Sequence, residues 1–252
     1  MKKLIIVIVL TTFSINVNAQ KNKLSFDFGY GINNFSMKNL NQFYIDSFAS
    51  KLDYLDNHIE KGFNSFVAIK YQPLEIFDIG FYSNYIYGET NGNPKFVETD
   101  NFGTPLNTHT GNFKLYAESI GFGITNSWYI SHILNFKSKK SKFIQNFRIA
   151  TEINIGVAFS KSTTDYRFTN YQLASSYNFY TSKDFDLQLA LKFEYDIVKQ
   201  PLVSTIGLKF GYKQLKTKTL NNIYQEEWKT LNKPINLDFS GFFGSIYLSF
   251  GK

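Results

Sequence analysis

The chain has 252 residues, a formal net charge of +7 and no cysteine. This length allows one domain, and the lack of cysteine excludes disulfides, thiol nucleophiles and cysteine-ligated metals. Aromatic residues make up 18% of the sequence, an enrichment that suits β-strands and membrane–water interfaces. The basic residues form no compact face that would predict binding to nucleic acid.

The start of the chain has the pattern of a secretory signal peptide, residues 1–19. Lys2 and Lys3 are basic, residues 4–10 are an unbroken apolar run, and a small residue, Ala19, ends the segment. We expect cleavage after Ala19, which leaves residues 20–252 as one domain. The apolar run is too short to span a bilayer, and no other long apolar segment follows. A mature chain in a membrane would therefore cross it with strands.

Eight stretches of alternating apolar and polar residues follow one another along the chain. They are residues 24–32, 63–72, 79–87, 119–125, 147–159, 185–197, 205–213 and 242–250. Period-two alternation predicts β-strands. Long connections alternate with mostly short ones, as on the two sides of an outer-membrane barrel, and an even strand number returns both termini to the periplasm. Ten strands would result if residues 91–104 or 166–180 supplied a further hairpin.

The most regular of these stretches runs from Phe147 to Phe159. Every second residue in it is apolar except Thr151, and the residues between are polar or small. At ~3.3 Å per residue the stretch spans roughly 40 Å. A tilt of about 45° reduces this height to about 28 Å, close to the apolar thickness of a bilayer.

The first long connection, residues 33–62, contains a helical pattern. Ser36 is a candidate cap for a helix. The apolar residues at helical spacing are Leu40, Phe43, Tyr44, Phe48, Leu52 and Leu55. We expect a short helix, which is either a lid or plug over the barrel mouth or part of an ordinary structured loop.

Three further connections are predicted to be external loops. Residues 89–112 are rich in Asn, Gly, Thr and Pro, residues 161–183 are rich in aromatic side chains, and residues 215–237 are polar. After the fourth stretch, apolar residues continue to alternate with other residues as far as Phe136. That pattern fits either a longer strand or a short interfacial helix.

The polar faces of the strands separate a membrane barrel from a soluble one. A soluble barrel also alternates, but it turns its apolar face inward. The polar faces here carry many small residues, which suits a crowded interior. These small residues are Gly29, Gly31, Gly80, Gly121, Gly123, Ala150, Gly156, Ala158, Ala190, Gly207 and Gly211. Tyr and Trp flank the apolar faces, so we expect those faces to contact lipid.

The region from Lys23 to Lys252 resembles the outer-membrane β-barrel domain family of small OmpA/OmpX-like and porin-like barrels. The resemblance rests on the signal peptide that precedes this region, on the alternating strands and on the final strand, GFFGSIYLSFGK. The resemblance implies an all-β, antiparallel up-and-down transmembrane β-barrel, most simply of eight strands. It also implies contact with outer-membrane lipid and with the barrel-insertion machinery, which reads the C-terminal strand. Such barrels usually end in an aromatic residue, whereas Phe250 is followed by Gly251 and Lys252.

In this register ten charged side chains point into the lumen, five of each sign. They are Asp27, Asp78, Glu152, Glu194 and Asp196 together with Lys70, Arg148, Lys192, Lys209 and Lys213. Because an unpaired buried charge costs several kcal/mol, we expect ion pairs. Glu152 should lie level with Lys192, Arg148 level with Glu194 or Asp196, and Lys70 between Asp27 and Asp78. Balanced signs favour a filled lumen over an ion-selective pore.

These features predict an outer-membrane protein with a structural or surface-binding role, without a cofactor, whose external loops would meet any extracellular ligand. A narrow porin-like channel for small solutes is the alternative. A lipid-modifying enzyme is more remote, because His58, His109 and His132 have no neighbouring Ser and acid in a catalytic motif. Ordinary loop polarity explains His58, near Asp53 and Asp56, better than a metal site does.

Overall fold

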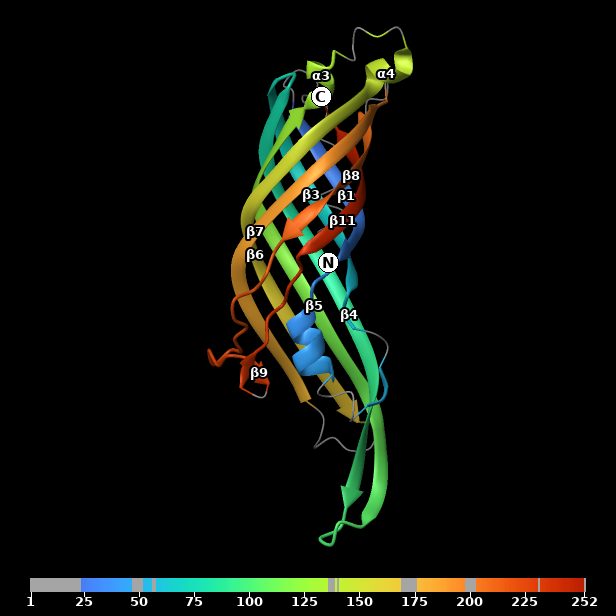
Figure 1. The fold of residues 1–252 in the computed structure, drawn as a ribbon, viewed down its shortest axis with the longest axis vertical. Helices are drawn as coiled ribbons and strands as arrows, with labels where there is room; N and C mark the ends of the chain where they lie inside the picture. The colour runs from blue at the N-terminus through green and yellow to red at the C-terminus, as the bar shows by residue number, and fades with distance from the viewer. Residues whose placement is uncertain are drawn as a thin grey trace.

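Eight antiparallel strands close into a barrel (Figure 1). The computed structural model describes residues 24–46, 52–55, 58–135, 139, 141–168, 176–197, 203–230 and 232–251. The barrel strands are β1 (Leu24–Asn34), β3 (Lys61–Leu74), β4 (Phe77–Thr99), β5 (Pro105–Tyr129), β6 (Phe147–Phe168), β7 (Ser176–Asp196), β8 (Thr205–Gln214) and β11 (Gly241–Phe250). Each pairs with its neighbours in the chain, and β1 pairs with β11 to close the ring. The predicted fold class is thereby confirmed, whereas the predicted signal peptide lies outside the described residues.

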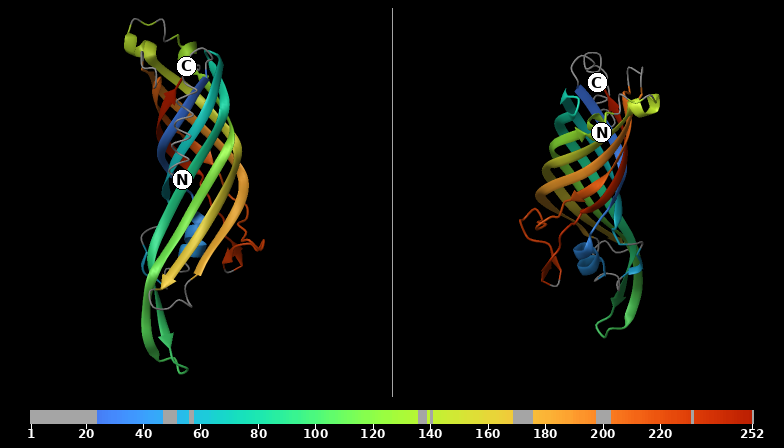
Figure 2. Two further views of the ribbon diagram at one scale, coloured as in Figure 1. Left: turned by 180° about the vertical axis from the view of Figure 1, so that it is seen from behind. Right: turned by 45° about the horizontal axis from the view of Figure 1, so that its top comes forward.

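The four central strands are about twice as long as most of the others. Strands β4 to β7 have 21 to 25 residues each, whereas β1, β8 and β11 have 10 or 11. The long strands therefore project beyond one end of the barrel, and the β4–β5 hairpin reaches furthest (Figures 1 and 2). We call these projecting parts, residues 88–118, 161–168 and 176–183, the projecting wall.

This wall corrects the predicted extent of two loops. Residues 89–112 are mostly strand, with only 100–104 between β4 and β5. Residues 161–168 and 176–183 are the ends of β6 and β7, and residues 169–175 lie outside the described residues. Both regions lengthen existing strands and add none to the ring. The physical reason is that strands outside the bilayer face water on their outer side, so they lose the apolar alternation while the hydrogen-bonded ladder continues.

Short elements fill the connections. In the first connection η1 (Leu40–Ile45) is a single π-helical turn, and β2 (Leu52–Leu55) pairs with β4. The expected helical spacing thus ends early: Leu52 and Leu55 lie in a strand, and Phe48 lies outside the described residues. Both alternatives for the region after residue 125 hold in part: β5 continues to Tyr129, and the short helix α3 (Ile130–Ile133) follows it. The helix α4 (Lys142–Asn146) then precedes β6. Near the end of the chain, β9 (Lys229–Thr230) and β10 (Lys233–Pro234) form a small hairpin.

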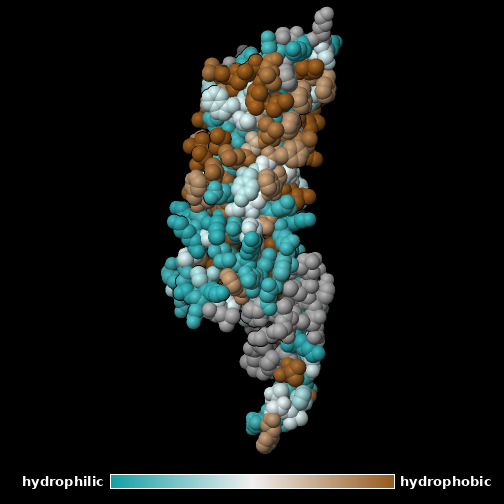
Figure 3. Space-filling model, viewed as in Figure 1, coloured by the Kyte–Doolittle hydropathy of each residue, from teal (hydrophilic) through white to brown (hydrophobic). Residues whose placement is uncertain are grey.

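The outer surface carries a wide apolar belt on the half of the barrel away from the projecting wall (Figure 3). One outward residue from each barrel strand, each at least 49% exposed, illustrates it: Phe28, Ile69, Phe81, Phe122, Ile155, Leu189, Phe210 and Ile246. So large an exposed apolar surface marks contact with lipid. Within the described ranges, no helix is long and apolar enough to cross a membrane.

Aromatic rings border this belt at both ends. Toward the projecting wall, Tyr30 and Phe63 have centroids 5.9 Å apart, and Tyr87 lies 5.1 Å from Phe63. At the opposite end, Phe77 lies 5.0 Å from Trp128. Such girdles mark the two membrane interfaces. Because longer connections are extracellular in these barrels, the projecting wall faces outward and α3 and α4 face the periplasm.

We expect Ile155→Arg to cost about 2–4 kcal/mol of folding free energy, because it places a charge near the middle of the lipid-facing belt. Refolding into phosphatidylcholine vesicles across a urea series measures this cost. Asn112→Arg is the control, since Asn112 is exposed on the projecting wall. Equal stability of both variants would contradict the position of the belt.

Candidate functional site

The inner face of the barrel holds the charged side chains predicted from the sequence. Nine of the ten are buried, and Asp196 lies at the periplasmic rim with 37% of its side chain exposed. The buried ones come from strands on all sides of the ring, so their contacts cross the lumen. Most of them form two connected groups, one around Glu152 and one around Glu194, whereas Lys213 and Asp78 have other partners.

Glu152 on β6 is the centre of the first group. Its Oε2 lies 2.7 Å from the Lys70 ammonium and 3.5 Å from that of Lys192, and its Oε1 contacts Lys209. Ser127 donates a hydrogen bond of 3.3 Å to the same carboxylate. Three ammonium groups from β3, β7 and β8 thus converge on one carboxylate, which ties opposite walls of the barrel together.

The backbone register departs from one expectation about Glu152. Glu152 lies opposite Ala190, and Lys192 lies opposite Ala150, so the two charges meet diagonally and not at one level. The reason is that a pair of strands sets only the backbone register, while long side chains reach across two positions. Lys70, on a strand that is not a neighbour of β6, approaches Glu152 at 2.7 Å.

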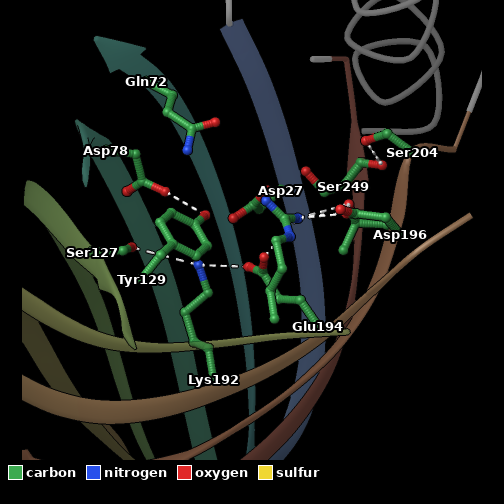
Figure 4. Close-up of polar contacts among 12 residues, drawn as sticks. Asp27, Gln72, Asp78, Ser127, Tyr129, Lys192, Glu194, Asp196, Ser204 and Ser249 are labelled. Carbon is green, nitrogen blue, oxygen red and sulfur yellow. Dashed lines mark hydrogen bonds and ion pairs between the residues drawn. The ribbon is translucent and has the colours of Figure 1, made fainter. Parts of the chain in front are cut away.

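Glu194 on β7 is the centre of the second group, near the periplasmic end (Figure 4). Arg148 lies opposite it in register, as expected, and its Nη2 is 2.7 Å from both Glu194 and Asp196. Lys192 approaches Glu194 at 2.8 Å, and the Tyr247 hydroxyl donates a 2.5 Å hydrogen bond to it. Lys192 therefore links this group to the first.

Lys70 has only one of its two expected neighbours as an ion-pair partner. Its ammonium lies 2.8 Å from Asp27, as expected. Asp78 instead accepts a 2.7 Å hydrogen bond from the Tyr129 hydroxyl. Tyr129 is a buried ring that fills this end of the lumen, and its ring also lies under the Arg148 guanidinium at 5.1 Å. Tyr129 thus takes the place of Lys70 as the partner of Asp78.

A further lumen acid, Asp186 on β7, was not among the predicted charges. It is fully buried, and the Lys213 ammonium lies 2.9 Å from its Oδ1. Tyr82 and Asn84 donate hydrogen bonds of 3.1 and 3.2 Å to its Oδ2. The sequence does place Asp186 on the inner face, because it lies an even number of residues from Glu194 on the same strand.

Large rings occupy the rest of the lumen, and glycines make room for them. A Cβ on Gly207 would lie 2.2 Å from the Tyr247 ring, and one on Gly29 would lie 2.2 Å from the Phe66 ring. A cavity of about 20 Å³ next to Phe66 has room for about one water molecule. These rings explain why the inner face needs small residues.

An apolar cluster, which we call the extracellular cap, covers the outer mouth of the barrel. Its buried residues are Phe35, Met37, Leu40, Tyr44, Ile45, Ile59, Ile86, Phe113, Leu115, Ala117, Ala158, Leu215, Leu220, Trp228, Ile235, Leu237 and Phe239. The Trp228 ring stacks on Tyr180 at 4.6 Å and meets Tyr44 edge-on at 4.7 Å. The helix of the first connection therefore packs inside this cluster, through Leu40, Tyr44 and Ile45.

Polar contacts hold the helix of the cap in place. The Asn41 side chain donates a 3.2 Å hydrogen bond to the Ile59 carbonyl and accepts a 3.1 Å bond from the Ile59 amide. Burial also raises the pKa of Tyr44 and of Tyr166. Both hydroxyls therefore stay neutral at physiological pH, as the apolar surroundings require.

The three histidines lie apart from one another. His58 contacts Asp46 at 2.7 Å beside the cap, His109 contacts Glu98 at 3.4 Å on the β4–β5 hairpin, and His132 lies in α3 at the periplasmic end. In the part of the chain that the structure describes, no group of three or more His, Asp or Glu side chains is arranged to hold a metal ion.

Comparisons with known proteins give a fold likeness only. No protein-family model and no curated protein matches the chain. Among solved structures, Ail of Yersinia pestis in complex with the heparin analogue sucrose octasulfate has 11% identity and a TM-score of 0.38, over 90% of this chain and 97% of that chain. The outer membrane protein OprG from Pseudomonas aeruginosa has 10% identity and a TM-score of 0.39, over 92% and 97%. Neisserial surface protein A has 10% identity and a TM-score of 0.35, over 89% and 95%.

The class of protein follows from the chain itself. A closed ring of eight strands, a lipid-facing belt between aromatic girdles and a polar interior define an outer-membrane β-barrel. What distinguishes this one is the combination of a charge-paired lumen with an apolar cap over its outer mouth.

We expect Glu152→Gln to destabilise the barrel by about 3–5 kcal/mol, because it leaves three buried ammonium groups without their shared carboxylate. Urea unfolding followed by heat-modifiable gel mobility measures the loss. Glu98→Gln, which removes a partly exposed partner of His109, is the control and should cost less than about 1 kcal/mol. Unchanged stability of Glu152→Gln with altered conductance would contradict a filled lumen.

Proposed function

We propose that this protein is a closed outer-membrane barrel with a structural or surface-binding role, and that its projecting wall and cap form the binding platform. The observation that carries the proposal is the extracellular cap, since apolar packing around Trp228 covers the mouth above a lumen already filled by paired charges. Two different seals in series would block the passage of a solute.

The β4–β5 hairpin supports the surface-binding part of the proposal. Asp100 accepts 2.8 Å hydrogen bonds from the amides of Phe102 and Thr104, which order the turn, and these bonds lower the Asp100 pKa. Phe102 is 94% exposed at this turn, and Leu106 is 58% exposed nearby. A preformed turn that presents apolar side chains to water suits contact with an extracellular ligand.

Delivery of the protein belongs to the same proposal. A signal peptide of residues 1–19 would direct export, and the insertion machinery would receive the barrel through β11, the last strand. Phe250 near its end would supply the aromatic mark. The enzyme alternative has less support, because the three histidines lie at three separate places.

A narrow channel is the second candidate, since the lumen is polar along much of its length. Single-channel conductance of the refolded mature chain in a planar bilayer distinguishes the two. We expect a folded, heat-modifiable barrel that gives no conductance steps. Steady, reproducible steps would contradict the closed barrel and would make the lumen charges selectivity determinants.

Opening the cap alone should leave conductance absent. We expect Trp228→Ala to speed proteolysis of residues 215–240, because it removes the ring that packs on Tyr44 and Tyr180, without producing conductance steps. Tyr224→Ala is the matched control, since Tyr224 lies in the same segment and is 77% exposed. Conductance in Trp228→Ala would show that the cap is the only seal.

A further inference from the structure

A groove lies on the outer wall of the barrel where the apolar belt ends. Strands β5, β6 and β7 place Ile120, Phe159 and Lys183 opposite one another, at one height along the barrel. Glu118, Lys161 and Thr181 lie at the next height toward the extracellular end. The first level still belongs to the belt, because Ile120 and Phe159 are 43% and 51% exposed. The second level is polar, so the membrane surface passes between them.

The segment that follows β8 forms the other side of this groove. Asn221 and Thr181 exchange two backbone hydrogen bonds of 2.8 and 3.0 Å, which fix the segment against β7. The Asn222 side chain accepts 2.9 Å bonds from the amides of Tyr224 and Glu226, so the turn is ordered. The space between segment and wall is about 610 Å³, and Asn222 and Gln225 line it together with the strand residues.

The groove combines an apolar floor with an excess of positive charge. The Lys183 ammonium lies 5.6 Å from the centre of the Phe159 ring, and among the described residues no carboxylate forms an ion pair with it. Lys161 lies over the Phe179 ring at 5.6 Å and is 3.5 Å from Glu118. Two ammonium groups and one carboxylate, which pairs with Lys161 alone, therefore lie at the edge of the belt.

We propose that this groove binds a phosphorylated glycolipid of the outer leaflet. Its headgroup phosphate would contact Lys161 and Lys183, its sugar would contact the amides of Asn222 and Gln225, and an acyl chain would lie along Ile120 and Phe159. The level of the groove selects this occupant, because a molecule there must be apolar on the membrane side and anionic and polar on the outer side.

The test compares lipid affinity of the folded mature barrel in phosphatidylethanolamine nanodiscs, with lipid A titrated as the probe and adducts counted by native mass spectrometry. We expect Lys161→Gln with Lys183→Gln to weaken lipid A binding roughly 20- to 30-fold, at about fivefold per lysine near the surface. Lys161→Arg with Lys183→Arg should retain most of the binding. Lys114→Gln, on the same outward face of β5 but beyond the groove, should bind as the wild type does.

Three results would overturn the proposal. The first is equal affinity of the double Gln variant and the wild type, with heat modifiability showing that both are folded. The second is equal affinity for dephosphorylated lipid A, which would remove the phosphate from the interaction. The third is equal affinity for phosphatidylglycerol, which would show that the groove recognises negative charge in general and not a phosphorylated sugar.

Discussion

The constraint on which this structure depends is that an eight-stranded barrel leaves no water-filled space for its interior charges. A lumen of this size is filled by side chains, and each buried charge must find an opposite charge or a hydrogen-bond donor. Glu152 meets this demand by accepting contacts from three lysines on three strands. The contacts that neutralise the charges are therefore also the contacts that hold opposite walls together, and the interior becomes a polar core.

The second constraint comes from unequal strand lengths. Where β4 to β7 continue beyond β1, β8 and β11, they would expose unpaired backbone edges to water and to other chains. The chain covers these edges with its own connections: Leu52–Leu55 pairs with β4, and Asn221 pairs with Thr181 of β7. Other parts of the same two connections, among them Leu40 and Leu220, place apolar residues on the inner face of the wall and form the cap. The cap is thus a consequence of the long wall as well as a cover for the lumen.

The sequence predicts the barrel well because a bilayer imposes period-two alternation on every membrane-spanning strand. That pattern places Arg148 and Glu194 on the same face, and the strand order brings them opposite each other. It does not predict contacts across the lumen, such as that of Lys70 with Glu152, because these depend on the stagger of the whole ring. It also fails beyond the membrane, where the outer face of residues 89–112 is polar and the alternation disappears. Asp186 could have been predicted as a lumen charge, since the alternation along its strand places its side chain on the inner face.

The two seals differ in their physics, and this difference bears on function. The lumen is closed by charge pairing at low dielectric, where loss of one partner leaves several others unsatisfied. The cap is closed by apolar packing outside the bilayer, with Trp228 packed on Tyr44 and Tyr180, and connections of this kind generally open at a lower free energy than core strands do. If the projecting wall binds a ligand as proposed, changes in the cap need not reach the lumen. The charge pairs would then hold the membrane span in place while the extracellular surface adapts to the ligand.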